Sequence, residues 1–281
     1  MNESMATVTQ QDIQRAIEEL EISGHSVCLH SSLSSLGQVD GGADAVVDAF
    51  LESGCTLLVP TFTGWQFEVH PDEDQLLEQN GWDVIEAQSL PRHTDTVFTP
   101  DQNVVDENMG VIPKAVLERP ERLRGDHPLN SFTAIGPKAK DLIEEQSWSD
   151  VYAPLRELTK QNGFVVLAGV GLDKMTILHL AEALAGRRLS RRWATGADGS
   201  AVAVPVGTCS DGFPNLENVL GLLAEEAHVG NSRWRAFPSA EAVTTTAAMI
   251  RSEPEITHCG DPECIRCPHA IAGGPRIQSP R

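Results

Sequence analysis

A histidine and a glutamate stand three positions apart in the segment TILHLAE, as His179 and Glu182. Apolar residues recur at helical spacing over residues 175–185, and on such a helix Met175, His179 and Glu182 fall on one face. A carboxylate one turn from an imidazole can fix the tautomer of the ring and favour its protonated form, which suits a general base near neutral pH. A polar helix face that only meets solvent would show the same spacing, and the spacing alone favours that simpler interpretation.

Three polar loops follow apolar runs that the sequence predicts as strands. They are HSSLSSLG (residues 30–37), PTFTGW (60–65) and GVGLDKMT (169–176), in which Asp173 is a fitting N-cap for the helix that carries His179. Because ligands bind at the carboxyl ends of strands in an open α/β sheet, these loops should meet at one edge. Serine hydroxyls and those of Thr61 and Thr63 suit phosphate or amide oxygens there, although an ordinary capped turn explains a serine-rich loop as well.

The signatures of several other ligand-binding and hydrolytic sites do not occur in the sequence. No G-x-G-x-x-G follows the first predicted strand, no G-K-[ST] occurs, and no G-x-S-x-G elbow presents a serine nucleophile. The sequence therefore does not support a dinucleotide site, a P-loop or an α/β-hydrolase triad.

Alternating strand-like and helical segments predict an α/β fold with a central, largely parallel (mixed) sheet and helices on both faces. Short apolar runs predict strands at residues 26–30, 55–60, 131–135 and 164–168. Helical periodicity predicts helices at residues 10–22, 41–53, 137–146, 175–185, 215–228 and 239–251. A Gly-Ala-Asp-Gly turn within residues 191–206 predicts an additional antiparallel hairpin.

The charge of the chain limits the partners that it can bind. Its 281 residues include 40 acidic and 21 basic side chains, which gives a net charge of −19. Such a field repels nucleic acid and anionic membranes and attracts polycations, but it can equally serve only solubility. Residues 64–97 lack periodicity and predict an irregular insertion. Its acidic side chains are candidates to meet a polycationic acceptor, or form a solvated acidic loop: Glu68, Asp72, Glu73, Asp74 and Glu78.

The first residues and the cysteines indicate a cytoplasmic protein. The segment MNESMATVTQQ has neither a basic region nor an apolar run, and no apolar stretch approaches the roughly 20 residues that a membrane span needs. Cys28, Cys55 and Cys209 occur singly among apolar residues, as core cysteines do in a reducing compartment.

The C-terminal segment, residues 257–281, contains a cluster of potential metal ligands outside a single predicted domain of residues 1–256. The cluster comprises His258, Cys259, Cys264, Cys267 and His269. These ligands suffice for a tetrahedral zinc ion. The paired C-x₂-C knuckles of strong zinc motifs are not repeated, so the sequence favours a tail without a metal and a reaction that requires none.

Four long segments resemble the aminoglycoside 3-N-acetyltransferase family, which is distinct from the common acetyltransferase superfold. They begin with LHSSLSSLGQVDGGADAVVDAFLESGCTLLVPTFT, continue with NMGVIPKAVLERPERLRGDHPLNSFTAIGP and GVGLDKMTILHLAE, and end with the weaker GNSRWRAFPSAEAV. The resemblance extends over roughly residues 7–252 and is interrupted mainly by the variable segment 64–96. It implies an α/β acetyltransferase that uses acetyl-CoA and acetylates an amino sugar.

The resemblance also implies roles for individual residues. His179 and Glu182 match the catalytic histidine and its partner, His30 matches a family histidine near the thiol end of CoA, and Asp173 is a further candidate for the catalytic centre and the acceptor. The resemblance implies contacts with the cofactor for Ser31, Ser32, Leu33, Ser34, Met109 and Gly110. The full set of candidate cofactor-binding residues also includes His30, Val111 and the strand-end threonines Thr61 and Thr63. Asn108 departs from an arginine in many relatives, and Asn130 from a second histidine.

These observations predict direct acetyl transfer within a ternary complex, with His179 as the general base for the acceptor amine. The expected enzyme is a monomer or homodimer that confers resistance to aminoglycosides. Two alternatives remain: an acyltransferase for a non-antibiotic biosynthetic amine, and a CoA-binding protein without turnover, which would leave His179 and Glu182 unexplained.

Overall fold

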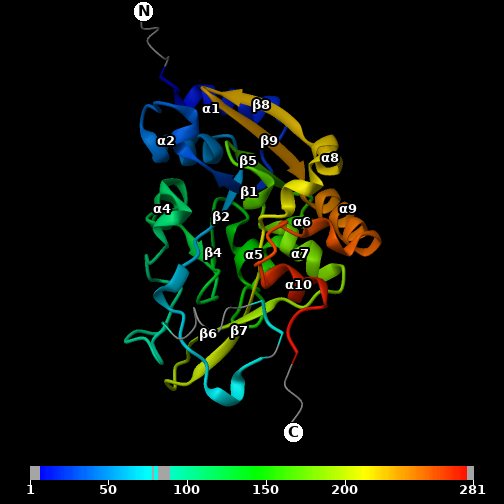
Figure 1. Cartoon of the computed structure of the whole chain (residues 1–281). Helices are drawn as coiled ribbons and strands as arrows, with labels where there is room; N and C mark the ends of the chain where they lie inside the picture. The colour runs from blue at the N-terminus through cyan, green and yellow to red at the C-terminus, as the bar shows by residue number, and fades with distance from the viewer. Residues whose placement is uncertain (1–6, 78, 82–88, 277–281) are drawn as a thin grey trace, which may run out of the picture.

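A mixed sheet forms the centre of the molecule (Figure 1). The computed structural model describes residues 7–77, 79–81 and 89–276. Within these residues seven strands pair in the order β3-β4-β2-β1-β5-β9-β8. Their bounds are β1 Ser26–Ser31, β2 Thr56–Pro60, β3 Leu123–Arg124, β4 Phe132–Ile135, β5 Phe164–Ala168, β8 Glu225–Val229 and β9 Ser232–Pro238.

Within the seven-stranded sheet, the parallel pairs are those among the three central strands. β1 pairs in parallel with β2 on one side and with β5 on the other, while β4 and β9 add antiparallel to these neighbours. Both faces of the central strands are covered, which is why their sequences read as continuous apolar runs. The predicted α/β class and mixed sheet are confirmed, and the carboxyl ends of β1, β2 and β5 meet at one edge.

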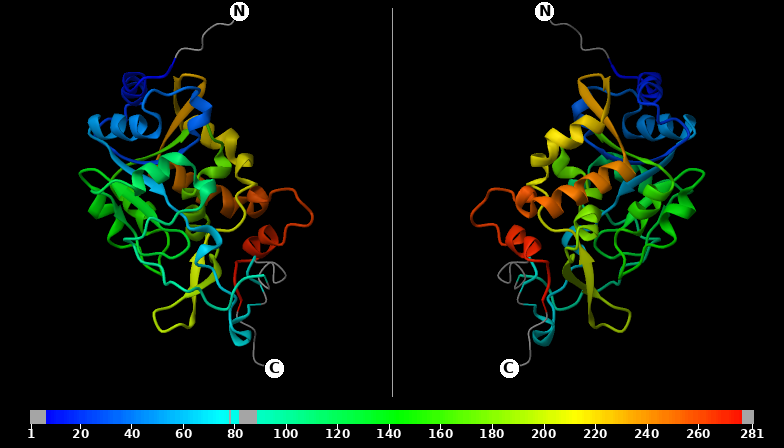
Figure 2. Two further views of the ribbon diagram at one scale, coloured as in Figure 1. Left: turned by 90° about the vertical axis from the view of Figure 1, so that its left-hand side faces the viewer. Right: turned by 90° about the vertical axis from the view of Figure 1, so that its right-hand side faces the viewer.

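Helices cover both faces of this sheet, as the two side views show (Figure 2). One layer contains α1 (Gln10–Glu19), α2 (Gly42–Glu52) and α4 (Val111–Leu117). The other contains α5 (Ala139–Ile143), α6 (Ala153–Lys160), α7 (Ile177–Leu184), α8 (Glu217–Leu220) and α9 (Ser239–Ser252). Alternate residues of β1 serve the two layers: Val27 and Leu29 pack with α1 and α2, and Cys28 packs on the opposite face.

The predicted antiparallel hairpin is present, formed by β6 (Ser190–Thr195) and β7 (Ala201–Val206) at the end of the molecule opposite β8 and β9 (Figure 1). The described part of segment 64–97 contains only the short 3-10 helices η2 (Gly64–Gln66) and η3 (Glu73–Gln75). It packs on the hairpin, where the Val69 amide donates to the Trp193 carbonyl at 2.9 Å.

The prediction of one helix over residues 215–228 was wrong. This stretch contains η6 (Phe213–Leu216), α8 and η7 (Gly221–Leu223), and then changes into β8. In β8 only Ala227 and Val229 are buried, which is the two-residue period of a strand. This short strand pattern follows a stretch whose composition is typical of a helix, and it is therefore easily missed in the sequence. Pairing with β9 decides the outcome, because it satisfies the backbone of the whole segment.

Helix α6 was not predicted, although Pro154 near its start and Leu155 and Leu158 on one face are signals for it. The remaining short helices are η1 (Leu33–Leu36), η4 (Glu107–Met109), η5 (Leu172–Lys174), η8 (Pro254–Thr257) and α10 (Arg266–Ile271). Across the residues that can be described, none of the helices has the length and apolar character needed to cross a membrane.

Arg124 joins three loop segments by hydrogen bonds: the loop after β2, the loop before β4 and the segment around residues 102–104. Its side chain is buried, and Nε donates to the Ser131 hydroxyl at 2.9 Å. The two terminal nitrogens donate to the carbonyls of Gln102, Thr61 and Val104 at 2.7 to 2.8 Å. Burial lowers the pKa of Arg124 to about 10, which still leaves the guanidinium charged at pH 7.

Replacement of Arg124 with leucine should lower the free energy of unfolding by about 3 kcal/mol or more, because several buried acceptors lose their donor. Urea denaturation followed by fluorescence measures this change. The control is Arg15→Ala, which removes a side chain that is 74% exposed and should change stability by less than about 0.5 kcal/mol. Equal stability of the two variants would show that the Arg124 hydrogen bonds contribute little.

Candidate functional site

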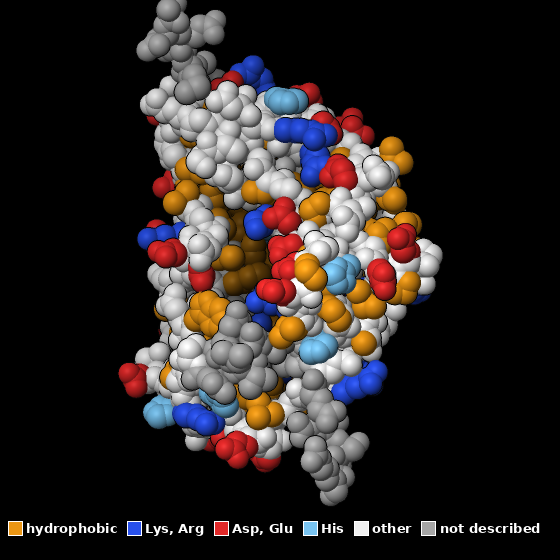
Figure 3. All heavy atoms as spheres, in the orientation of Figure 1, with side chains coloured by type: hydrophobic (Ala, Val, Ile, Leu, Met, Phe, Trp, Pro, Cys, Tyr) orange, Lys and Arg blue, Asp and Glu red, His pale blue; other side chains and the backbone are white. Residues whose placement is uncertain are grey.

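A cavity of about 650 Å³ opens at the carboxyl ends of β1, β2 and β5. The face shown in Figure 3 is hollowed near its centre, with hydrophobic side chains at the base and acidic side chains along one rim. The predicted site residues that line this cavity are His30, Ser31, Ser32, Leu33, Ser34, Met109, Gly110, Val111, Asp173 and His179. The three loops and the start of α7 therefore converge as the strand-end rule predicts.

His179 and Glu182 form a buried pair at the cavity, in which His179 lines the wall and Glu182 lies outside the lining. Nδ1 of His179 lies 2.7 Å from Oε2 of Glu182, and the two residues are 7% and 5% exposed. The solvated polar face that the helical spacing alone favoured is therefore excluded. Because the carboxylate holds Nδ1, the imidazole is oriented with Nε2 free of any hydrogen bond from the described residues, and His179 itself lines the cavity.

Arg187 is the second partner of Glu182, and no sequence pattern indicates it. Its Nη1 donates to Oε1 of Glu182 at 2.6 Å and to the Thr257 hydroxyl at 2.7 Å, while Nη2 donates to the Pro254 carbonyl. Glu182 thus bridges a buried guanidinium and the imidazole of His179. Three further arginines follow within five residues, so composition could not single out this one.

Close packing fixes the His179 ring on its other sides. The ring of Tyr152, the one tyrosine in the sequence, is stacked on it at 6.2 Å between centroids, and Phe213 is tilted against it at 4.9 Å. Gly207 approaches so closely that a Cβ there would overlap both the imidazole and the Tyr152 hydroxyl. The ring position is therefore set by two segments that are remote from His179 in the sequence, one at Tyr152 and one between Gly207 and Phe213.

The serine loop forms one wall of the cavity. The Ser31 hydroxyl is buried and has no hydrogen-bond partner in the described part of the chain. The Ser32 and Ser34 hydroxyls lie 3.0 Å apart, and Ser35 anchors the loop by donating to the Ser32 carbonyl at 2.6 Å. A buried hydroxyl without a partner costs free energy, so the Ser31 hydroxyl is suited to form a hydrogen bond with a polar group of a ligand.

His30 shares a face of β1 with Cys28, and its Nε2 lies 3.6 Å from the Cys28 sulfur. This face points toward the layer that contains α7, which explains why two histidines from distant segments reach one cavity. Burial lowers the pKa of His30 to about 4, so the imidazole is neutral at pH 7.

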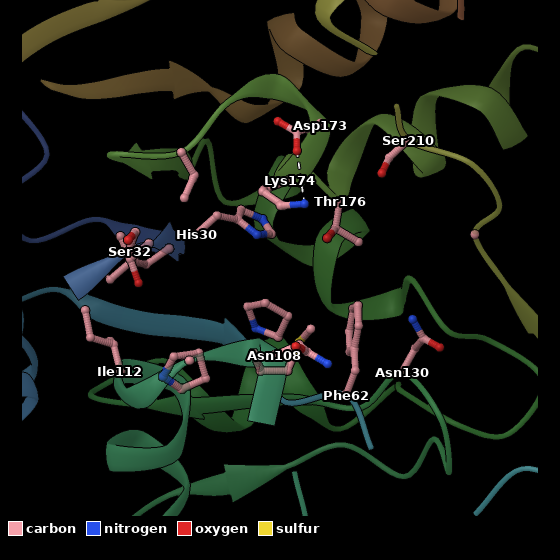
Figure 4. A pocket seen from close by; sticks show the side chains of 18 of the residues that line it. His30, Ser32, Phe62, Asn108, Ile112, Asn130, Asp173, Lys174, Thr176 and Ser210 are labelled. Carbon is pink, nitrogen blue, oxygen red and sulfur yellow. Dashed lines mark ion pairs between the residues drawn. The ribbon is translucent and has the colours of Figure 1, made fainter. Parts of the chain in front are cut away.

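The opposite side of the cavity is formed by the segment around α4. In the close view, Asn108, Ile112 and Phe62 lie across the cavity from Asp173 and Thr176 (Figure 4). Asn130, at the position of the second histidine in many relatives, also lines the cavity, as do Thr208 and Ser210, which the sequence did not suggest.

Two predictions about the strand-end loops need correction. The Thr61 hydroxyl bonds with the Thr133 hydroxyl at 2.8 Å, and the Thr63 hydroxyl donates to the Pro128 carbonyl at 2.7 Å. Both side chains are fully buried away from the cavity lining, so their hydroxyls stabilise the loop. Asp173 is not an N-cap: it lies within η5, and Thr176 occupies the N-cap position of α7.

The acidic insertion does not reach this cavity in its described part. Glu68 is buried and paired with Arg192 at 3.3 Å, and Asp72 caps η3 in a capping box with Gln75. Glu73 and Asp74 lie beside another depression, and Glu78 falls outside the described residues. The acidic residue within the described lining is Asp173, whose carboxylate is 3.0 Å from Nζ of Lys174.

Comparisons with known sequences point to a single family. The family model for aminoglycoside 3-N-acetyltransferase matches residues 28–251. The chain is 35% identical over 202 residues to aminoglycoside N(3)-acetyltransferase IX of Micromonospora chalcea. The alignment covers 69% of this chain and 68% of that protein. The chain is 31% identical over 183 residues to aminoglycoside N(3)-acetyltransferase VIII of Streptomyces fradiae, covering 63% of this chain and 62% of that protein.

Solved structures share the fold described above. The apoenzyme of aminoglycoside acetyltransferase AAC(3)-IVa superposes with a TM-score of 0.76 at 24% identity, covering 97% of this chain and 100% of that one. AAC(3)-Xa gives a TM-score of 0.68 at 28% identity over 88% of this chain and 94% of that one. AAC-IIIb, solved as a binary complex with CoASH, gives a TM-score of 0.69 at 21% identity and covers 89% of this chain and 97% of that one. The resemblance inferred from the motifs is confirmed, and this chain belongs to the aminoglycoside 3-N-acetyltransferase family.

Proposed function

We propose that this chain transfers the acetyl group of acetyl-CoA to an aminoglycoside, at the 3-amino group of its 2-deoxystreptamine ring, and thereby confers resistance. The observation that carries the proposal is the buried His179–Glu182 pair, which has one ring nitrogen held by the carboxylate and the ring exposed to the cavity. Family membership supports the class of reaction. The burial of both side chains excludes the alternative of a solvated polar helix face.

The serine loop and the segment around Met109 suit the donor. Acetyl-CoA supplies the acetyl group as a thioester. The unpaired Ser31 hydroxyl can donate to a ligand oxygen, and Ser32 and Ser34 line the same wall. Gly110, with φ +86° and open space beside its α-carbon, lets the chain between Met109 and Val111 line the cavity without a side chain. The cavity volume lies within the roughly 300–1,000 Å³ usual for ligand sites.

His179 would act as the general base for transfer in a ternary complex. The acceptor nitrogen attacks the thioester carbonyl, His179 takes the nitrogen proton, and that proton leaves with the CoA sulfur when the C–S bond breaks. Glu182 orients the ring and stabilises the imidazolium that forms. The Ser31 hydroxyl is a suitable donor for the negative charge that develops on the carbonyl oxygen.

An acetyl-transfer assay against a panel of acceptors tests this function. The assay measures CoA thiol released from acetyl-CoA in the presence of several aminoglycosides and of simple mono- and diamines. Turnover with aminoglycosides that contain 2-deoxystreptamine, and an acetyl group on the 3-nitrogen by NMR, is the expected result. Turnover only with simple amines would favour the biosynthetic alternative, and thioester binding without turnover on any acceptor would contradict the proposal.

Asp173 is the acidic group that we expect to meet a cationic acceptor. Asp173→Asn should raise the KM for an aminoglycoside about tenfold, because a charge-assisted contact is lost, with little change in the KM for acetyl-CoA. Steady-state kinetics in a salt series measure both constants. Asp72→Asn is the matched control, since Asp72 lies outside the cavity lining and should leave the acceptor KM unchanged. A larger increase in the acceptor KM for Asp72→Asn than for Asp173→Asn would indicate that the acceptor binds at the insertion of residues 64–97.

A further inference from the structure

Four cysteine sulfurs from two distant parts of the chain meet beside the candidate site. Cys209 follows β7, and the other three, Cys259, Cys264 and Cys267, lie in the C-terminal segment. All four sulfur atoms lie within 4.8 Å of one another. Each is a free thiol, and Cys209 and Cys267 are buried. This is the one such group of potential metal ligands among the residues that the structure describes.

The spacing of the sulfurs suits a tetrahedral metal ion. Zinc–sulfur bonds of about 2.3 Å imply about 3.8 Å between thiolates around a tetrahedral ion, so a contraction of at most about 1 Å would close the site. Four thiolates complete the coordination of zinc and leave no open position, as structural rather than catalytic zinc requires.

The local backbone is folded around these cysteines. The Cys259 amide donates to the Cys267 sulfur at 3.5 Å, a contact that would also stabilise a thiolate. Between them the chain makes a tight turn in which the Asp261 carboxylate accepts from the Glu263 amide at 2.9 Å and the Asp261 carbonyl accepts from the Cys264 amide at 3.2 Å. A C-x₄-C-x₂-C segment is thereby presented to Cys209.

The structure changes the ligand set that the sequence suggested. Nδ1 of His258 accepts a hydrogen bond from the Gly260 amide, and Nδ1 of His269 accepts one from the Gly81 amide, both at 2.9 Å. Neither histidine belongs to the sulfur cluster. The apolar neighbours of Cys209 in the sequence predict an isolated core residue, but its sulfur lies with the three C-terminal sulfurs.

We infer that Cys209, Cys259, Cys264 and Cys267 together bind one structural zinc ion, which joins the wall of the candidate site to the C-terminal segment. The inference goes beyond the proposed acetyl transfer and does not depend on it.

The four cysteines adjoin both the cavity wall and the hydrogen bonds of Arg187. Cys209 lies between Thr208 and Ser210, two residues that line the cavity. On the other side, the segment that leads into Cys259 contains Thr257, whose hydroxyl accepts from Arg187, the partner of Glu182. Asn215 already bridges the two segments by donating to the carbonyls of Ile256 and His258 at 3.0 Å. Zinc bound here would hold the Arg187 anchor and the cavity wall in one rigid unit.

Metal analysis of the full chain is the first test. Protein purified with a reductant, without chelators and without an immobilised-metal column, should contain zinc in a one-to-one ratio by plasma mass spectrometry. X-ray absorption at the zinc edge should show four sulfur neighbours at about 2.3 Å. This second measurement uses the unmodified protein, so it remains decisive even if cysteine variants fail to fold.

Variants then test the ligand set. Cys209→Ser and Cys264→Ser should each lose most of the bound zinc and lower Tm by about 5 °C or more, because the metal stabilises only the folded chain. His258→Ala and Cys55→Ser are the matched controls: the first removes a rejected ligand in the same segment, and the second removes a free cysteine outside the cluster. Both should retain the full zinc content.

Several outcomes would overturn the inference. They are a folded protein without stoichiometric metal, a disulfide between any two of the four cysteines, one equivalent of iron in place of zinc, or a nitrogen ligand in the absorption spectrum. Loss of zinc from His258→Ala would contradict the four-sulfur set. Because metal content is measured without substrates, a failure of the acetyl-transfer proposal would leave these readouts unchanged.

Discussion

Replacement of His179 with alanine should lower kcat by about a hundredfold to ten-thousandfold, the usual loss when a positioned general base is removed. The physical reason is the geometry of the pair: Glu182 holds Nδ1 at 2.7 Å, so the ring presents its other nitrogen to the cavity. Release of CoA thiol at saturating acetyl-CoA and acceptor measures the rate. Because a general base acts in proton transfer, binding of CoA should change much less than turnover.

Two companion variants make the result specific. His228→Ala removes an exposed imidazole on β8 and should retain full activity. Glu182→Gln keeps the size of the side chain but removes the charge that pairs with both His179 and Arg187, so kcat should fall while CoA binding is retained. Near wild-type turnover of His179→Ala, with normal folding by circular dichroism, would refute the role of His179 as the base.

Replacement of Arg187 with methionine should lower the free energy of unfolding by about 3–5 kcal/mol, because the buried Glu182 carboxylate would lose one of its two partners. The change also removes the hydrogen bonds to Thr257 and Pro254. Arg187 does not line the cavity, so it acts as a positioning residue through Glu182. A misplaced imidazole should reduce kcat by up to about a hundredfold.

The kinetic pattern separates positioning from general destabilisation. At a temperature where the variant remains folded, kcat should fall while the KM for acetyl-CoA stays close to that of the unmodified protein. Arg187→Lys should restore only part of the activity, since one ammonium group cannot reproduce the fork that reaches Glu182, Thr257 and Pro254. The neighbouring exposed Arg188→Met is the control and should change stability by less than about 0.5 kcal/mol. An unchanged kcat in the folded Arg187→Met variant would show that Glu182 orients His179 without help from Arg187.

Much of the site could be predicted because its parts are local in the sequence. His179 and Glu182 are one helical turn apart, and helix geometry brings such residues together wherever the helix lies. The serine loop follows a strand whose apolar run is unmistakable, and residues at the ends of parallel strands share one edge of the sheet. Motif resemblance then favoured a catalytic role for this pair, a role that spacing alone leaves as the weaker interpretation.

Other features depend on contacts between distant segments, which no local pattern encodes. Thr61 and Thr63 carry suitable hydroxyls, but their direction depends on β4 and the loop before it, which satisfy those hydroxyls internally. The change from helix to strand in residues 225–229 depends on pairing with β9. In both cases the backbone and side-chain groups take the partners that folding brings near them.

The sequence by itself determined the family, the α/β class and the residue pair at the centre of the site, since periodicity and motif order are properties of the chain. Only the tertiary structure showed that Glu182 is shared with Arg187, that Gly207 and Tyr152 confine the His179 ring, and that Cys209 joins the C-terminal cysteines. These groups are separated by many residues, and their meeting depends on how the layers pack around the sheet. Packing therefore decided which polar side chains face the cavity and which stabilise its walls.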